Sequence, residues 1–337
     1  MAAINFVVVG IACTTFFINH KGQMVFGRNY DWITGTGVVN TNLRGMQKTS
    51  LQPGDNKRLT WVSNYGSITF NQYGKEFPTG GMNEKGLVVE LMWLDESEFP
   101  KPDHRPALSV LQWIQYQLDN CSTIEEVIAT DEKVRINDDG APQHYLVADA
   151  NGNAATIEFL NGKMVVHKGS NLPYSVLANS TYSESFKALR NKSTAVTGDN
   201  SLQRFGTACT MIEKLKQENS NQSLIDYSFN ILNEVASGDY TKWSIVYDIS
   251  NKKIFFKTAE YKDVKTVDVN CFDFSCTAKA YTFDMNQKGN GDISKKFTLY
   301  SNRVNEKKLK QAFQESKNNI EVEESKPKFN GKKMRPL

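Results

Sequence analysis

The sequence predicts an α+β domain in which two antiparallel sheets lie between layers of helices. Strand-like and helix-like stretches occur in separate groups, in the order strands, helices, strands, helices, strands, which is typical of this class. Turn signals separate neighbouring strand-like stretches. The 39% hydrophobic and 11% aromatic content is enough for a core of this size.

The first group of strands begins with a hairpin over residues 13–30 that turns at His20-Lys21-Gly22. Three further β-rich stretches follow it, at residues 37–42, 59–70 and 86–94. The spacing of apolar residues then predicts a helix over 107–118, and Ser122 with the acidic residues that follow predicts the start of a second helix over 122–130.

In the second half of the chain, strand-like stretches again come first and helices follow them. Residues 144–168 contain β-type runs separated by two turn signals, at 150–153 and at Asn161-Gly162. Helices are predicted at about 201–217 and 223–236, and a last hairpin over 242–259 turns at Asn251-Lys252. The sequence shows no internal repeat and no linker, so we expect one domain over residues 13–320 and a polar, disordered tail over 321–337.

Composition excludes several classes of function. The net charge is +3, from 40 Lys and Arg against 37 Asp and Glu, and the basic residues are interspersed with acidic ones, so no nucleic-acid partner is expected. No apolar run reaches the roughly 18 residues of a membrane span. The five cysteines and four histidines are too dispersed to suggest a metal site. Cys271 and Cys276 are either a local disulfide or two free thiols.

A short apolar leader precedes Cys13. Residues 4–11 are apolar, and Gly10 and Ala12 place small residues at −3 and −1 relative to Cys13, as before a signal-peptidase cleavage site. We therefore expect residues 1–12 to be removed and the protein to be exported. The alternative is a buried N-terminal strand in a cytoplasmic protein, because the leader is short and has no basic residue before it.

Removal of the leader would give Cys13 a free α-amine with a pKa of about 7.7–8.0, which can act as a base. One residue then carries both nucleophile and base, and no catalytic histidine is required. The predicted hairpin brings Arg28 and Asp31 back towards Cys13. A cation beside a thiol favours the thiolate, and a carboxylate can orient the amine. The opposing interpretation is an ordinary buried strand cysteine beside a surface Arg–Asp pair.

Several motifs together resemble the choloylglycine hydrolase family of conjugated bile acid hydrolases and penicillin V acylases, over roughly residues 13–260. They are the Cys-Thr start, FGRNYDW, GGMNEKGLVVELMWL, HYLVADANGNAATIEFLNGK, VLANSTY and SLQRF. The resemblance implies a four-layer αββα N-terminal-nucleophile hydrolase that cleaves linear amides through an acyl-thioester on Cys13, without a cofactor or metal. The segment between VLANSTY and SLQRF is shorter than in bile salt hydrolases of Gram-positive bacteria and resembles the exported branch of the family from Gram-negative bacteria, which implies a periplasmic location. A tetramer assembled through this segment is therefore not expected, although a homo-oligomer is possible.

By the same resemblance the catalytic residues are Cys13, Arg28, Asp31, Asn83, Asn179 and Arg204. Asn179 is expected to stabilise the oxyanion, with Asn83 as a further donor or substrate positioner, and Arg204 to anchor the network. Outside the family context, Asn83 and Asn179 would be turn residues and Arg204 an exposed helix residue.

The substrate is expected to be a small amide with a bulky apolar acyl group, such as a phenoxyacetyl, bile acid or fatty acyl group. Trp32, Met92 and Trp93 are candidates to contact that group, with core packing as the equal alternative. N-acyl homoserine lactones are the next candidate substrates, because exported relatives of this family would meet them. Two other functions remain open: a non-catalytic lipoprotein with a lipid on Cys13, and a Cys–His hydrolase that uses His144.

Overall fold

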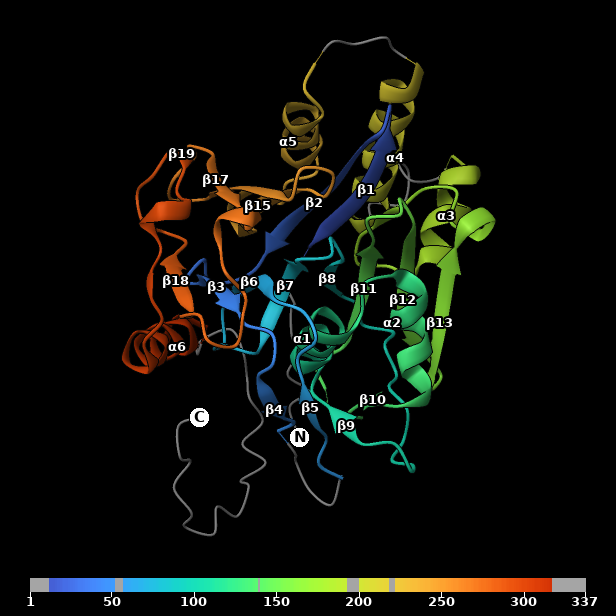
Figure 1. Ribbon diagram of the computed structural model, residues 1–337. Coiled ribbons are helices and arrows are strands. Elements are labelled where there is room, and N and C mark those ends of the chain that lie inside the picture. The colour runs from blue at the N-terminus through green and yellow to red at the C-terminus, as the bar shows by residue number, and fades with distance from the viewer. Residues whose placement is uncertain (1–11, 52–56, 139, 193–199, 218–221, 317–337) are drawn as a thin grey trace, which may run out of the picture.

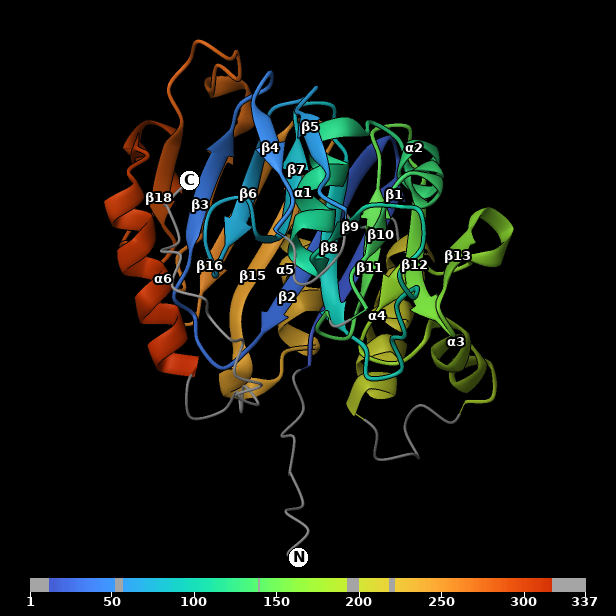
Figure 2. The same ribbon diagram turned by 90° about the horizontal axis from the view of Figure 1, so that it is seen from below.

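The computed structural model describes residues 12–51, 57–138, 140–192, 200–217 and 222–316. Over these residues two large β-sheets stack face to face, and helices cover the outer face of each, as the sequence predicts (Figures 1 and 2). The predicted leader, apart from Ala12, and the predicted tail over 321–337 lie outside the described residues.

The first sheet has seven strands and carries the start of the predicted domain. Neighbouring strands are antiparallel except the last pair. In spatial order the strands are β14 (Val176–Leu177), β1 (Thr14–His20), β2 (Gln23–Asp31), β15 (Thr241–Asp248), β16 (Lys253–Thr258), β17 (Lys265–Asp268) and β19 (Gly291–Asp292).

The second sheet has nine strands, all antiparallel to their neighbours. In spatial order they are β13 (Lys163–Lys168), β12 (Ala154–Leu160), β11 (Gln143–Ala148), β8 (Val88–Trp93), β7 (Pro78–Asn83), β6 (Ser67–Asn71), β3 (Val38–Asn42), β18 (Tyr281–Asp284) and β20 (Thr298–Leu299). Two short pairs lie apart: β4 (Gln47–Thr49) with β5 (Thr60–Val62), and β9 (Ala107–Leu108) with β10 (Arg135–Ile136).

The helices form the two outer layers. Helices α4 (Asn200–Gln217) and α5 (Leu224–Glu234) pack on β1, β2 and β15 of the first sheet, and α3 (Tyr182–Arg190) packs on α4. Helix α1 (Val110–Asn120) packs on β7 and β8 of the second sheet, and α2 (Ile124–Ala129) shares its hydrophobic cluster. Helix α6 (Asn302–Ser316) lies at the edge of the second sheet beside β18 and β3 (Figures 1 and 2). Short 3₁₀ turns occupy Thr130–Glu132, Gly169–Asn171, Gly238–Tyr240, Val269–Cys271 and Ser294–Lys296.

The β1–β2 hairpin places Cys13 immediately before the start of β1, next to the end of β2 in the first sheet. Lys21 and Gly22 both have positive φ angles, of 50° and 81°, which is the backbone of a tight two-residue hairpin turn. The turn fixes the register, so that Thr14 pairs with Asn29 and Thr15 with Arg28. Cys13 therefore lies at the open end of the hairpin, beside the last residues of β2.

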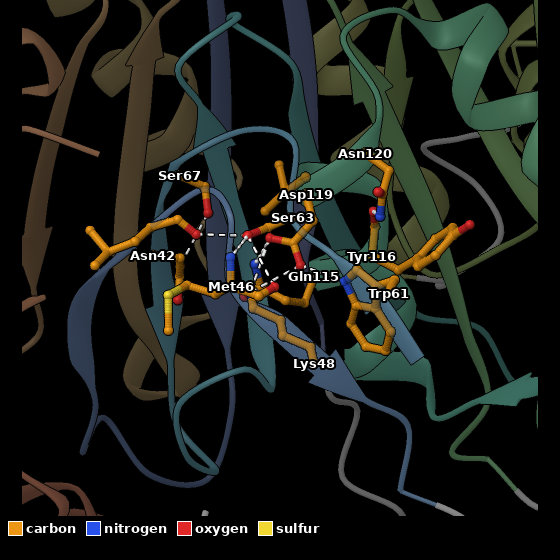
Figure 3. A network of polar contacts seen from close by, with 12 residues as sticks. Asn42, Met46, Lys48, Trp61, Ser63, Ser67, Gln115, Tyr116, Asp119 and Asn120 are labelled. Carbon is orange, nitrogen blue, oxygen red and sulfur yellow. Dashed lines mark hydrogen bonds and ion pairs between the residues drawn. The ribbon is translucent and has the colours of Figure 1, made fainter. Parts of the chain in front are cut away.

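The β4–β5 ribbon is attached to α1 by one buried carboxylate (Figure 3). Asp119 accepts hydrogen bonds from Lys48 at 3.0 Å, Trp61 at 2.8 Å and Gln115 at 2.8 Å. Its backbone carbonyl accepts the N–H groups of residues 64 and 65. These contacts explain why residues 59–70, which the sequence predicts as one β-rich stretch, divide between β5 and β6 in different sheets.

Two helices were not predicted from the sequence, α3 and α6. The second has few apolar residues, and only Ala312 and Ser316 on it are buried, so its periodic pattern is weak. Within the described residues no helix is both long and apolar enough to cross a membrane.

Candidate active site

Cys13 is buried where the two sheets and α4 meet. Its side chain is 1% exposed and belongs to the hydrophobic cluster between the sheets. The thiol Sγ donates to the backbone carbonyl of Asp31, 3.8 Å away. Burial raises the pKa of the thiol to about 11, although the cations of Arg28 and Arg204 lower it and the Asp31 charge raises it further. At neutral pH the thiol is therefore protonated, and its reaction as a nucleophile requires a base.

Arg28 projects from β2 into the space between the sheets. Its guanidinium forms an ion pair with Glu90 at 2.7 Å and donates to the Leu91 carbonyl at 3.2 Å and the Thr79 hydroxyl at 3.3 Å. It also lies 4.6 Å from the centre of the Tyr30 ring. These contacts hold a positive charge near Cys13.

Glu90 is a site residue that the sequence interpretation missed. Burial raises its pKa to about 7, while Arg28 and the hydroxyl of Tyr247, which donates to it, lower that pKa. A Cβ atom at Gly80 would lie 2.0 Å from the Glu90 carboxylate carbon, so only glycine leaves room for this carboxylate. The signal in the sequence was a single acidic residue inside the apolar run GLVVELMWL.

Asp31 is buried at the end of β2, where the register of β15 shifts between Thr241 and Trp243. Burial raises the pKa of its carboxyl to about 6, and the nearby Thr241 and Ser237 hydroxyls and the Arg204 charge lower it in part. Among the described residues, however, neither carboxylate oxygen has a hydrogen-bond partner of acceptable geometry. A buried carboxylate without a donor is costly, and a new donor nearby would stabilise it.

Arg204 connects the start of the chain to Asn179. Its Nη1 donates to the backbone carbonyl of Cys13 and to the Thr14 hydroxyl, and its Nη2 donates to Oδ1 of Asn179 at 2.8 Å. Its Nε donates to Asn200 on the same helix. Arg204 is 6% exposed, so it is not the surface residue that its place on a helix would suggest.

Asn179 retains a hydrogen-bond donor. Its Nδ2 donates to the backbone carbonyl of Trp93 at 2.8 Å, and its backbone N–H donates to Ser201 at 2.9 Å. An amide group has two hydrogens, and within the described residues the Trp93 carbonyl accepts only one of them. The other can stabilise a developing negative charge.

Asn83 does not contact Arg204 or Asn179, and its hydrogen bonds favour a structural role over the expected role as a donor to the substrate. Its Nδ2 donates both hydrogens to α1, to the Leu118 carbonyl at 2.9 Å and the Cys121 carbonyl at 2.7 Å. Its Oδ1 accepts the backbone N–H groups of Lys85 and Leu87, each at 3.0 Å. Asn83 therefore closes its own turn and caps the end of α1, with no amide hydrogen left for catalysis.

The three residues expected to contact the acyl group differ in exposure. Trp32 and Trp93 are partly exposed, and their ring centres lie 6.3 Å apart. The Trp32 ring also stacks on Tyr30, with 6.2 Å between centres, and Tyr30 stacks on Trp243 at 4.4 Å. Met92 is fully buried in the cluster that contains Cys13, which agrees with the alternative of core packing.

His144 is not in contact with Cys13 in the part of the chain that the structure describes. Its Nδ1 lies 3.2 Å from the Glu158 carboxylate, and its Nε2 lies 2.8 Å from the Ala178 carbonyl. Both ring nitrogens are thus engaged elsewhere, which contradicts a Cys–His dyad. Cys271 and Cys276 are exposed free thiols rather than a disulfide.

Comparison with known proteins agrees with this arrangement. Residues 13–213 match the family described as linear amide C–N hydrolases, choloylglycine hydrolase family. The matched region begins at Cys13 and covers more than half of the chain. The chain therefore belongs to this family of amidases.

Two relatives above 25% identity are penicillin V acylases. The chain is 33% identical over 193 residues to that of Pectobacterium atrosepticum, covering 51% of this chain and 50% of the relative, so it spans about half the length of that curated protein. It is 29% identical to the solved structure of penicillin V acylase from Agrobacterium tumefaciens, with a TM-score of 0.74 over 86% of this chain and 98% of that one.

A conjugated bile acid hydrolase from Clostridium perfringens has the same fold. Its structure matches with a TM-score of 0.68 and 17% identity over 83% of this chain and 98% of that one. These matches confirm the N-terminal-nucleophile hydrolase architecture of two sheets between helices.

Proposed function

We propose that this protein hydrolyses linear amides that carry an apolar acyl group, with the thiol of Cys13 as nucleophile once residues 1–12 have been removed. The observation that carries the proposal is the buried carboxylate of Asp31, which has no hydrogen-bond partner among the described residues although it is close enough to Cys13 to raise the pKa of its thiol. A new α-amine on Cys13 would supply a donor for this carboxylate and a base for the thiol.

The proposed reaction has two steps. In the first, the amine takes the proton of the Cys13 thiol, the sulfur bonds to the amide carbonyl carbon, and the carbonyl oxygen becomes an oxyanion. The free amide hydrogen of Asn179 is placed to stabilise this charge. The C–N bond then breaks, and the leaving nitrogen takes the proton from the amine.

In the second step water attacks the acyl-thioester, releases the carboxylic acid and restores the thiol. The Arg204 guanidinium holds the backbone of Cys13 and the side chain of Asn179 in one geometry, so nucleophile and oxyanion donor keep a fixed separation during both steps.

For the acyl group we propose an aryl group such as phenoxyacetyl as the first candidate. The partly exposed rings of Trp32 and Trp93 support this choice, because paired aromatic rings favour a planar apolar group. The two relatives that are penicillin V acylases also favour it. Bile acid and fatty acyl amides and N-acyl homoserine lactones are the next substrates to test.

The lipoprotein alternative is less well supported. Cys13 is 1% exposed and Arg204 holds its backbone carbonyl, so the residue does not lie at the surface, where a lipid anchor would reach a membrane. Export itself remains a proposal that rests on the leader sequence.

The test begins with the mass and N-terminal sequence of the protein secreted by a Gram-negative host. We expect a chain that starts at unmodified Cys13 and releases amine from phenoxymethylpenicillin. Cys13→Ala should abolish turnover, and brief incubation of the wild type with substrate should add the acyl mass to Cys13. Turnover by Cys13→Ala, or by a chain that still begins at Met1, would contradict the mechanism.

A further inference from the structure

We propose that helix α6 determines the position of the Trp32 ring and thereby the acyl-group specificity of the enzyme. The specificity part rests on the proposed function, in which Trp32 contacts the acyl group. Helix α6 is distant in sequence from Trp32 and lies beyond residues 13–213, which match the family. In the fold, however, its last turn reaches the segment that follows β2.

The first connection is a chain of hydrogen bonds from the indole to the helix. Nε1 of Trp32 donates to the Tyr73 hydroxyl at 2.7 Å, and that hydroxyl lies 3.3 Å from Oγ of Ser316. Ser316 donates its proton to the Ala312 carbonyl, 2.8 Å away. Because Ser316 has only this proton, Tyr73 must donate to Ser316 and accept from Trp32. The hydroxyl protons of Tyr73 and Ser316 are both donated, so the hydrogen bonds all run in one direction, from Trp32 to the Ala312 carbonyl on α6.

The second connection fixes the backbone after Trp32. The carboxylate of Glu315 accepts from the hydroxyls of Thr34 and Thr36, the latter at 2.8 Å. Both threonines are 4% exposed. The backbone N–H of Thr36 also donates to Oγ1 of Thr34 at 3.0 Å, which closes this short segment on itself. Hydrogen bonds to a charged group are stronger than neutral ones, so Glu315 holds the segment firmly.

The third connection holds the turn between β6 and β7 that carries Tyr73. Asn305 accepts the backbone N–H of Lys75 at 3.0 Å, and the Phe313 and Tyr73 ring centres are 5.1 Å apart. In the same turn, Gln72 donates to the Thr34 carbonyl at 2.7 Å and accepts from the Tyr30 hydroxyl at 2.7 Å.

Helix α6, the β6–β7 turn and residues 32–36 thus form one connected unit, which we call the α6 brace. Its inner end is the stacked pair of Tyr30 and Trp32. A ring that only contacts the acyl group contributes to binding of that group rather than to the reacting bonds. Loosening the brace should therefore raise KM for bulky acyl groups and leave kcat nearly unchanged.

The test uses the full chain labelled with 5-fluorotryptophan, because ¹⁹F NMR reports each of its five tryptophans. Trp32→Phe assigns the Trp32 resonance. Ser316→Ala and Tyr73→Phe each break the hydrogen-bond chain. Glu306→Gln is the matched control, because Glu306 is on the same helix but its ion pair in the described part of the chain is with exposed Lys310, away from Trp32.

In Ser316→Ala and Tyr73→Phe we expect the Trp32 resonance to shift while the control keeps it in place. We also expect KM for a phenoxyacetyl amide to rise by about 2–10-fold, the effect of one hydrogen bond, with a smaller change for an acetyl amide. An unchanged Trp32 resonance in both variants would overturn the proposal.

A shifted resonance with unchanged KM for every amide would overturn the specificity role. Loss of the proposed function has a different signature. A wild-type chain that hydrolyses no amide would remove the specificity role, while the Trp32 resonance would still show whether α6 positions the ring.

Discussion

The guanidinium of Arg28 lies 2.7 Å from the carboxylate of Glu90, and neither side chain has any exposed surface. Arg28 lowers the pKa of the Cys13 thiol, and Glu90 partly neutralises Arg28. The ion pair therefore limits how strongly the cation can favour the thiolate.

Replacing Glu90 with Gln should make the Cys13 thiol more acidic. Gln keeps the shape of the side chain and can accept a hydrogen bond from Arg28, but it leaves the positive charge uncompensated. We expect alkylation of Cys13 by iodoacetamide to reach its half-maximal rate at a lower pH than in the wild type. Because breaking a buried ion pair costs about 3–5 kcal/mol, the rates should be measured well below the melting temperature.

Asp119→Asn is the control for this experiment. It also removes a carboxylate from a buried ion pair, but the partner cation there is Lys48, which is not among the groups that act on the Cys13 thiol, whereas Arg28 is. An alkylation profile of Glu90→Gln that coincides with the wild type would contradict the proposed electrostatic coupling.

Asn83→Ala should reduce stability and leave catalysis intact. The substitution leaves the carbonyls of Leu118 and Cys121 without their donor and opens the 83–87 turn, at an expected cost of about 2–4 kcal/mol. Urea unfolding measures that cost, and kcat per folded molecule should stay within about twofold of the wild type. Asn64→Ala, at an exposed asparagine near the same helix end, should change stability by less than about 0.5 kcal/mol. A large loss of kcat at full folding would restore Asn83 to the catalytic set.

The comparison of Asn83 with Asn179 shows what the sequence could and could not predict. Both are asparagines in turn-like segments, and local sequence does not distinguish them. Their roles differ because of partners that only the tertiary structure supplies, the end of α1 for Asn83 and Arg204 for Asn179. The β1–β2 hairpin was predictable because its turn residues and alternation are local.

Glu90 is a second residue whose partner could not be predicted from the sequence. A single carboxylate in an apolar strand is visible in the sequence, yet its partner Arg28 is on the other sheet. The two-sheet architecture and the succession of strands and helices along the chain followed from local patterns, whereas the order of strands within each sheet and the polar contacts between the sheets did not. Helix α6 was missed because its few buried residues leave almost no periodic signal.

Arg204→Lys should lower kcat more than it changes KM. An ammonium group cannot hold the Cys13 carbonyl, the Thr14 hydroxyl and Asn179 at once, since it lacks the planar fork of a guanidinium. Misplacement of nucleophile and oxyanion donor should reduce kcat by about 10–100-fold. Steady-state kinetics on one amide give both constants, and Arg190→Lys on the surface of α3 should match the wild type. A tenfold rise in KM with normal kcat would instead place Arg204 in substrate binding.

Asp31 should make the stability of the unprocessed chain depend on pH. Burial raises the pKa of this carboxyl from 3.8 to about 6, so the folded protein retains a proton that the unfolded chain has lost. The resulting stability is fully present below about pH 3.8 and is lost as pH rises through about 6, with a total of about 3 kcal/mol.

Asp31→Asn cannot titrate, so its free energy of unfolding should fall less than that of the wild type between pH 4 and pH 7. Urea unfolding of both unprocessed chains across this range gives the difference. Once the leader is removed, a cationic amine beside the carboxylate should reduce the dependence. Parallel stability curves for the two chains would show that the Asp31 pKa is not raised.

The position of Asn83 also bears on how other sequences are interpreted. Its four hydrogen bonds join the turn after β7 to the end of α1, and they involve none of the groups around Cys13. A chain that lost Cys13 but kept the Met-Asn-Glu-Lys-Gly segment could still build this corner of the molecule. Finding that segment in a new sequence is therefore grounds for assigning the architecture, and the assignment of hydrolysis has to come from the residue that follows the leader.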